Sequence, residues 1–392
     1  MEGDFIKINK KLLPLSWIYG LAVRLRNTMF EIGLLKTRSF TIPVISVGNI
    51  TVGGTGKTPH VEYLANLLRH KFRVAILSRG YKRKSRGFIK ANAKTTMPEI
   101  GDEPYQMKQK FHDVTIAVDK SRCHGIDLLT EQDRQLDVVL LDDAFQHRYV
   151  KPGINILLVD YHRLIIYDQL LPAGRLREPL NGKDRADIVI VTKCPKDLKP
   201  MAFRVITKAM NLYPYQQLYF TTLGYDKLKP IFKDAKRSKT TPELSELKDT
   251  NTLLLTGIAS PEQLRHDLTP QITNLSLLTF ADHHQFKKKD VQRINDTFAA
   301  MKSPKCIITT EKDATRLQAA EGLSDEVRQN IYLLPVRIEF MLDQEESFNN
   351  HIIGYVRKNS RNSILAKRKD DHPSKDSNHS GNRSRTISFR DN

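Results

Sequence analysis

Short runs of apolar residues recur along the first half of the chain, and polar segments with helical spacing separate them. The runs are IPVISVGNI, RVAILSRG, VTIAVD, LDVVLLDDAF, INILLVD and ADIVIVTK. Such nearly continuous runs are typical of strands that are buried on both faces of a parallel sheet. Helices are predicted from Pro59, which suits a first turn, to Arg69, and from Ser121, a candidate N-cap, to Glu131. The pattern predicts an α/β lobe over residues 37–216.

The alternation of apolar runs and helical segments ends around QQLYFTTLGYDKLKPIF. Residues 217–249 alternate loosely and are rich in Lys, Thr and Pro, which predicts a linker or hairpin. A second series of apolar runs follows, namely TLLLTGIAS, LSLLTFADHH, KCIITTEKDATRL and IYLLPVRIEF, and it predicts a second α/β lobe over residues 250–358. Two lobes joined by a hinge leave a cleft between them, which is a common place for a ligand.

The N-terminal segment, residues 1–36, contains the apolar stretch KLLPLSWIYGLAVRLRN, which includes Pro14. A helix that crosses a bilayer needs about 20 predominantly apolar residues, and this stretch is too short. Its mixture of Leu and Trp17 with Arg24 and Arg26 resembles a helix that lies in a membrane interface. An amphipathic helix packed on its own lobe fits the pattern equally well, and both interpretations stay open.

The chain is strongly basic. Its 392 residues carry a formal net charge of +19, which indicates an anionic partner: nucleic acid, phospholipid headgroups or an acidic substrate. The basic residues are scattered, with no aromatic-interleaved strand or recognition helix, so we expect no nucleic-acid partner. Part of the excess charge lies in residues 359–392, which are poor in apolar residues and are expected to be disordered.

The strongest local signal is VISVGNITVGGTGKTPH, from Val44 to His60. An apolar strand leads into a glycine-rich loop and then into a helix, as in phosphate-binding loops, whose helix dipole favours anions. Lys57 supplies a positive charge, and the Thr58 hydroxyl can reach a magnesium ion. Thr51 stands where the pattern G-x-x-x-x-G-K-[ST] has glycine. The alternative is a glycine-rich turn that binds nothing.

A metal-bound nucleotide also needs acidic residues. LDVVLLDDAFQH places Asp142 and Asp143 at the end of a predicted buried strand. Burying two carboxylates is costly unless a cation faces them; the alternative is a pair that caps the next helix. The guanine-reading pattern [NT]-K-x-D is broken in VTKCPKD, where Pro195 replaces Asp, so the sequence favours ATP over GTP.

Several segments, in this order, together resemble the tetraacyldisaccharide 4'-kinases, which phosphorylate the lipid A precursor. They are LLPLSWIYG, VGNITVGGTGKTP, LSRGY, GDEP, LLDDAFQH, LPAGRLREP, FADHH and TEKD. The resemblance covers roughly residues 12–315, and threonine at position 51 is normal in this family. It departs at Lys82, where many members have glycine, and in the basic tail.

The resemblance implies a P-loop kinase with two Rossmann-like lobes, mainly parallel sheets and a hairpin linker. Such an enzyme uses ATP and Mg²⁺ and transfers the γ-phosphoryl group to the 4'-hydroxyl of an acylated glucosamine disaccharide 1-phosphate. It is expected to bind an anionic membrane surface as a peripheral protein, on the cytoplasmic face of the inner membrane of a Gram-negative bacterium.

The resemblance also implies roles for individual residues. Asp102 of GDEP would be the catalytic base, His283 of FADHH its partner across the cleft, and Lys57 would act on the phosphates. Asp142 and Asp143, with Thr58, would hold magnesium. The residues expected to contact ATP are Thr51, Val52, Gly53, Gly54, Thr55, Gly56, Lys57 and Thr58, with Arg177 and Glu178 near the phosphates.

Other interpretations of these residues stay open. GDEP has the composition of a plain turn, and His283 with His284 could be a surface pair. The cations Lys82, Arg83, Lys84 and Arg86 form either a solvated loop or a grip for a substrate phosphate or anionic lipid. At the level of function, the alternatives are a nucleic-acid-associated P-loop ATPase and a membrane-peripheral GTPase.

Overall fold

The computed structural model describes residues 6, 8–232, 241–258, 261–281 and 284–370, and of residues 361–370 the backbone alone. Within this part of the chain the strands form two sheets, one of nine strands and one of five. The strands are β1 (Val44–Gly48), β2 (Val74–Ser78), β3 (Ile89–Lys90), β4 (Thr115–Val118), β5 (Val138–Asp142), β6 (Ile154–Asp160), β7 (Ile188–Thr192), β8 (Gln217–Tyr225), β9 (Lys229–Pro230), β10 (Asn251–Thr256), β11 (Leu275–Thr279), β12 (Lys305–Thr310), β13 (Ile331–Leu334) and β14 (Val336–Phe340).

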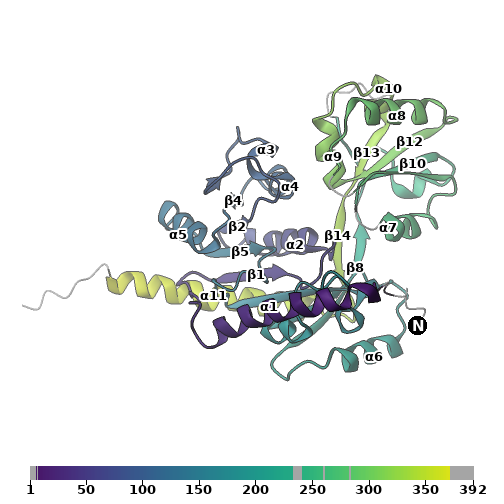
Figure 1. Cartoon of the computed structure of the whole chain (residues 1–392). Coiled ribbons are helices and arrows are strands. Elements are labelled where there is room, and N and C mark those ends of the chain that lie inside the picture. Colours follow the sequence, from purple (N-terminus) through teal and green to yellow (C-terminus); the bar gives the residue numbers. More distant parts are fainter. Residues whose placement is uncertain (1–5, 7, 233–240, 259–260, 282–283, 371–392) are drawn as a thin grey trace, which may run out of the picture.

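Helices cover both sheets (Figure 1). The α-helices are α1 (Leu13–Glu31), α2 (Lys57–Arg69), α3 (Met97–Ile100), α4 (Asp102–Lys110), α5 (Arg122–Gln132), α6 (Pro200–Met210), α7 (Pro261–Leu268), α8 (Lys288–Ala299), α9 (Glu311–Gln318), α10 (Asp325–Asn330) and α11 (Glu345–Asp370). Short 3-10 helices lie at Lys10–Leu12, Tyr161–Arg163, Ile165–Tyr167, Leu180–Arg185 and Leu244–Leu247.

The larger lobe is built on the sheet β14-β8-β7-β6-β1-β5-β2-β4-β3. Its strands run parallel from β8 to β4, and antiparallel strands close both edges. The smaller lobe has the order β11-β10-β12-β13-β9, parallel except for β9. The predicted α/β class with mainly parallel sheets is confirmed.

The core of the larger lobe follows the apolar periodicity of its sequence. On α2, the buried residues Val61, Leu64 and Leu68 recur at helical spacing and pack against the sheet together with Phe348 and Ile352 of α11. The opposite face packs on α5 and α6. The predicted N-cap of α5 is present, since the Ser121 hydroxyl accepts a bond from the backbone N–H of His124.

The lobes are divided differently from the predicted boundaries. Residues 217–225 form β8, a full strand of the larger sheet, and β14 pairs with it antiparallel although it lies in the segment assigned to the second lobe. Helix α11 also packs on the larger lobe, and it extends to Asp370, into the segment expected to be disordered. Residues 371–392 lie outside the described part of the chain. The two paired strands thus come from distant segments of the chain, and local alternation carries no signal for that pairing. Figure 1 shows β8 and β14 rising together from the larger lobe towards the smaller one.

Helix α1 presents its apolar residues to solvent. Its buried positions include Ser16, Gly20 and Asn27, and the Ser16 hydroxyl donates to the carbonyl of Leu170 at 3.0 Å. The side chains of Trp17 and Leu21 are 72% and 70% exposed. The further exposed apolar residues of this helix and the turn after it are Leu15, Ile18, Leu25, Ile32 and Leu34. The helix thus packs on its own lobe through these small and polar residues and Phe30, which leaves most of its large apolar residues uncovered.

Candidate active site

The glycine-rich loop connects β1 to α2 and has the conformation of a phosphate-binding loop. Gly53 and Gly56 have φ angles of 126° and 82°, in the left-handed region where a side chain causes strain. Gly56 is the N-cap of α2, so Lys57 and Thr58 begin the helix. A Cβ at Gly54 would have no atom of the described residues within 4 Å, apart from its chain neighbours.

Thr51, which departs from the general pattern, has a clear place in the structure. It forms an antiparallel bridge with Leu176, flanked by a bond from the Val52 N–H to the Arg175 carbonyl at 2.8 Å and one from the Arg177 N–H to the Ile50 carbonyl at 2.7 Å. Such a bridge needs no left-handed backbone, so threonine is tolerated here. The bridge also brings the LREP segment against the loop.

Residues that we did not predict brace this loop. The Asn49 amide donates to the Thr55 hydroxyl at 2.9 Å, and the Gln146 amide donates to the Asn49 carbonyl at 2.6 Å. The Thr192 hydroxyl donates to the Thr55 carbonyl at 3.0 Å. His60 is buried, and its Nδ1–H donates to the Gly56 carbonyl at 2.7 Å. Most of these bonds end on backbone carbonyls, and no motif encodes such pairing.

The two predicted acids lie at the end of β5, as expected. Asp142 is 1% exposed, and within the described part of the chain neither of its carboxylate oxygens has a hydrogen-bond partner. Burial raises its pKa to about 7, and the negative charges of Glu103 and Asp143 add to the shift, whereas Lys57 and Arg122 oppose it.

Asp143 faces two cations. Its Oδ1 lies 3.6 Å from the Lys57 ammonium and 3.6 Å from the Arg177 guanidinium. The structure thus brings together Lys57, Asp142, Asp143 and Arg177, all of which the sequence singled out.

These acids fit a magnesium ion. A buried carboxylate without a hydrogen-bond partner is costly, and a cation offsets that cost. Mg²⁺ is commonly held by one or two carboxylates with waters and substrate phosphates. The described residues contain no group of three or more His, Cys, Asp or Glu gathered at ligand spacing. A magnesium site here would have Asp142, Asp143 and the Thr58 hydroxyl as its protein ligands.

Glu178 has a different environment from its neighbour Arg177. It is 4% exposed, and its Oε2 accepts bonds from Arg185 at 2.7 Å and from Asn27 of α1 at 3.5 Å. Tyr19 of α1 donates to the Arg177 carbonyl at 2.8 Å. These bonds tie the LREP segment to α1. We therefore interpret Glu178 as an anchor for this segment rather than as a direct phosphate contact.

Arg122 is a further buried charge beside the acids. It is 2% exposed, and it donates to the carbonyls of Asp119 and Asp142, each at 3.1 Å. Burial lowers its pKa to about 10, while the charges of Asp142 and Asp143 favour its charged form. Nothing in the sequence distinguished this arginine from the others of a basic chain.

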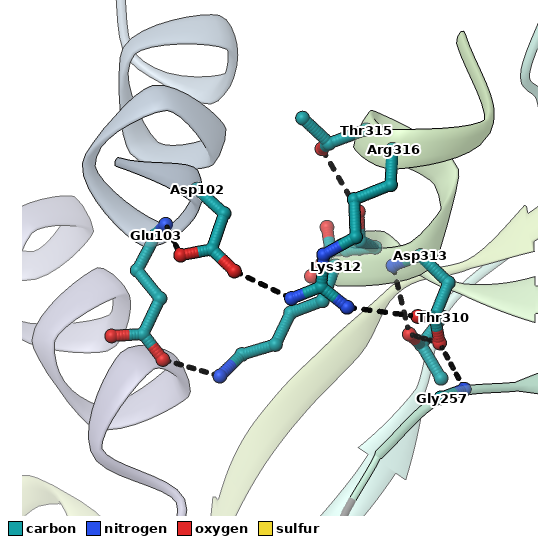
Figure 2. Close-up of polar contacts among 9 residues, drawn as sticks. Asp102, Glu103, Gly257, Thr310, Lys312, Asp313, Thr315 and Arg316 are labelled. Atoms are coloured by element: carbon teal, nitrogen blue, oxygen red, sulfur yellow. Dashed lines mark hydrogen bonds and ion pairs between the residues drawn. The ribbon is translucent and has the colours of Figure 1, made fainter. Parts of the chain in front are cut away.

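Asp102 begins α4, and Gly101 before it has a φ of 92°. A Cβ at Gly101 would lie 2.8 Å from the Tyr81 carbonyl, so this turn requires glycine. The Asp102 carboxylate forms an ion pair with Arg316 of α9 at 2.5 Å, and Glu103 pairs with Lys312 (Figure 2). The expected partner, His283, lies outside the described residues. Its neighbour His284 contacts Asp290 at 2.9 Å.

The basic loop after SRGY is partly structural. Lys82 has a φ of 58°, the left-handed conformation that glycine adopts easily, which accounts for glycine in many members of the resembled family. Arg83 donates to the carbonyls of Gly87 at 2.7 Å and Val118 at 3.4 Å, so it holds the loop closed.

Comparisons by sequence and by structure point to the same family of known proteins. The family model of the tetraacyldisaccharide-1-P 4'-kinases matches residues 8–357. A tetraacyldisaccharide 4'-kinase of Phocaeicola vulgatus is 58% identical over 93% of this chain and 99% of the relative. One of Flavobacterium johnsoniae is 44% identical over 90% and 98%. The crystal structure of LpxK from Aquifex aeolicus in complex with ATP has a TM-score of 0.67 at 30% identity, over 89% of this chain and 99% of that one.

Proposed function

The chain belongs to the tetraacyldisaccharide 4'-kinase family, and from this membership we propose how its residues carry out the reaction. The protein is an ATP-dependent kinase that transfers the γ-phosphoryl group to the 4'-hydroxyl of a tetraacylated glucosamine disaccharide 1-phosphate in lipid A biosynthesis. Which residues do this work, the role of Mg²⁺ and the place of the reaction are our proposals.

The single observation that carries the residue assignment is the juxtaposition at the end of β5. Asp142, whose carboxylate has no hydrogen-bond partner among the described residues, lies next to Asp143, and Asp143 faces Lys57 from the phosphate loop. Phosphoryl transfer depends mainly on positioning and on stabilising the negative charge that develops on the transferred group. Lys57 and Arg177 would supply positive charge there, and the backbone N–H groups at the start of α2 would donate to the phosphates.

Asp142, Asp143 and Thr58 would hold Mg²⁺, which neutralises phosphate charge when it is bound. Asp102 would accept the proton of the sugar hydroxyl, which is a poor nucleophile until that proton leaves. Asp102 begins α4 beside Glu103, whose negative charge helps to raise the pKa of Asp142. His283 keeps its predicted role as the partner of Asp102.

The assay that tests the function uses ATP labelled at the γ-phosphate, Mg²⁺ and a purified tetraacylated disaccharide 1-phosphate in detergent. We expect a labelled glycolipid with ATP and less of it when GTP, labelled in the same position, replaces ATP. We expect no labelled glycolipid when Mg²⁺ is chelated. The absence of labelled lipid with the wild-type protein would contradict the function. Transfer that is unaffected by chelation would contradict the magnesium role.

We further propose that α1 docks on an anionic membrane surface, which places the enzyme peripherally on the cytoplasmic face of the bacterial inner membrane. Within the described part of the chain, every helix is too short or too polar to cross a bilayer. The exposed Trp17 and Leu21 face away from the lobe, and Arg24 on the same helix suits anionic headgroups.

The double substitution Trp17→Ser with Leu21→Ser should weaken binding to vesicles that contain anionic lipid. Each large apolar side chain contributes about 1.5 to 3 kcal/mol when fully buried, so we expect at least about a tenfold loss in partitioning. Met201→Ser is the control, because Met201 is also 67% exposed but belongs to α6. Equal losses in both variants, or none in either, would contradict docking through α1. Sedimentation with vesicles measures the effect.

A further inference from the structure

The contact between α4 of the larger lobe and α9 of the smaller lobe consists of matched charges. Among the described residues, Asp102 pairs with Arg316, Glu103 with Lys312, and Lys110 with Glu311 at 3.1 Å. The partners follow opposite orders along the two helices, as expected for helices that meet antiparallel. Figure 2 shows the first two pairs lying side by side between the lobes.

The pair between Asp102 and Arg316 differs from an ordinary surface ion pair. The Arg316 side chain is 1% exposed and the Asp102 side chain 13%. Exposed pairs typically contribute only about 0 to 1 kcal/mol, whereas truncating one partner of a buried pair is strongly destabilising. A buried arginine that reaches across two lobes therefore fixes their relative position at this point.

A second carboxylate, that of Asp313 in the smaller lobe, also binds the Arg316 guanidinium. Its Nη1 donates to Asp313 at 3.1 Å, and Asp313 is 0% exposed. Asp313 in turn accepts bonds from the Gly257 N–H at 2.9 Å and the Thr310 hydroxyl at 2.7 Å (Figure 2). The guanidinium is planar and rigid, so the bond from its Nη1 to Asp313 also fixes the direction of its Nη2, which contacts Asp102.

We propose that Arg316 is a positioning residue for the phosphoryl acceptor step, and that it holds the Asp102 carboxylate in the direction needed to take the proton of the sugar hydroxyl. This inference rests on the proposed role of Asp102 as the base. The carboxylate is oriented on both sides, since its Oδ1 accepts from the Glu103 N–H at 3.1 Å and its Oδ2 accepts from Arg316. Each carboxylate oxygen has two lone pairs, so an oxygen that accepts one of these bonds still carries a second lone pair.

The competing interpretation is that Arg316 only ties the lobes together. Lys312 provides the matched control, because it makes the neighbouring interlobe ion pair with Glu103 but serves a different carboxylate. Arg316→Gln should lower kcat by about 100-fold, the effect expected when a general base loses its orientation, with KM for ATP changed less than about threefold. Lys312→Gln should lower kcat less than about tenfold, because it removes an ion pair without disturbing Asp102.

Two further variants distinguish a loss of positioning from a loss of folding. Arg316→Lys keeps the positive charge but loses the planar guanidinium, so its kcat should lie between those of Arg316→Gln and the wild type. Because this variant keeps the charge at the buried position, it should fold even if Arg316→Gln does not. Combining Arg316→Gln with Asp102→Asn should add little to Asp102→Asn alone, because residues that act as a unit are not additive. Circular dichroism confirms that each variant is folded.

The outcomes separate the inference from the function on which it rests. If the wild-type protein transfers no phosphate to the lipid, the proposed function fails. If the wild type is active but Arg316→Gln keeps its kcat, or loses no more than Lys312→Gln, the positioning role is wrong. Fully multiplicative losses with Asp102→Asn would also overturn it. A loss confined to KM for ATP would assign Arg316 to nucleotide binding instead, and it too would overturn the inference.

Discussion

The phosphate loop and the contact between α4 and α9 are held by different kinds of interaction. The loop is braced by short hydrogen bonds within the larger lobe, such as those of Asn49 and Thr192 to Thr55. Asp102 is oriented from the smaller lobe by Arg316. In the proposed mechanism, the groups that bind the nucleotide thus lie in one lobe, whereas the acceptor step depends on how the two lobes meet.

Packing around the two helices supports this distinction. Met107 of α4 is buried in the core of the larger lobe, and Ala314 and Leu317 of α9 are buried in the core of the smaller one. Each helix thus packs its apolar face in its own lobe and meets the other helix through charges. The contact between the lobes at this point therefore rests on ion pairs rather than on a shared apolar core.

The largest effect is expected from the phosphate loop itself. Lys57→Ala removes a charge that faces Asp143 and, in the proposed mechanism, stabilises the phosphates during transfer. We expect turnover to fall by about 1000-fold. The control is Lys71→Ala, an exposed lysine just beyond the other end of α2. Turnover of the Lys57 variant close to wild type, in the labelled-lipid assay, would contradict the nucleotide-site assignment.

A substitution of Asp102, at the contact between α4 and α9, should lower the rate of phosphoryl transfer without changing ATP binding. Asp102→Ala should lower the transfer rate by about 100-fold, as for loss of a general base, while ATP affinity measured by calorimetry stays unchanged. His283→Ala should act in the same way if the two residues work together. Asp113→Ala, an exposed aspartate just after α4, is the control. Reduced ATP affinity in the Asp102 variant would show that nucleotide binding and the acceptor step are not separable, and undiminished turnover would remove the base assignment.

The sequence predicted the elements with continuous local patterns. All six apolar runs of the first half became strands of the larger sheet, and the loop, Asp142 and Asp143 lie where the motifs indicated. It did not predict the pairing of β8 with β14 or the packing of α11 on the larger lobe, because these contacts join distant segments. Arg316 was missed for the same reason, since its role depends on a carboxylate from the other lobe.

The smallest effect is expected from His60, which lies where the two regions are connected. Its Nδ1–H donates to the Gly56 carbonyl of the loop, and its Nε2 accepts from the Thr221 hydroxyl of β8 at 3.1 Å. β8 is one of the two strands that lead to the smaller lobe. Burial lowers the pKa of His60 from 6.5 to about 4, so the folded protein keeps the ring neutral at pH values where the unfolded chain is protonated.

The sign of the pH effect follows from that shift. Because the folded pKa is depressed, the contribution of His60 is fully present above pH 6.5 and is lost as the pH falls towards 4. Between pH 7 and pH 5 this corresponds to roughly 2 kcal/mol of unfolding free energy. His60→Gln should flatten the dependence of stability on pH in that window, whereas the exposed His112→Gln should keep the wild-type slope. Urea unfolding at a series of pH values measures both. Equal slopes for the two variants would contradict a buried, neutral His60 between the loop and β8.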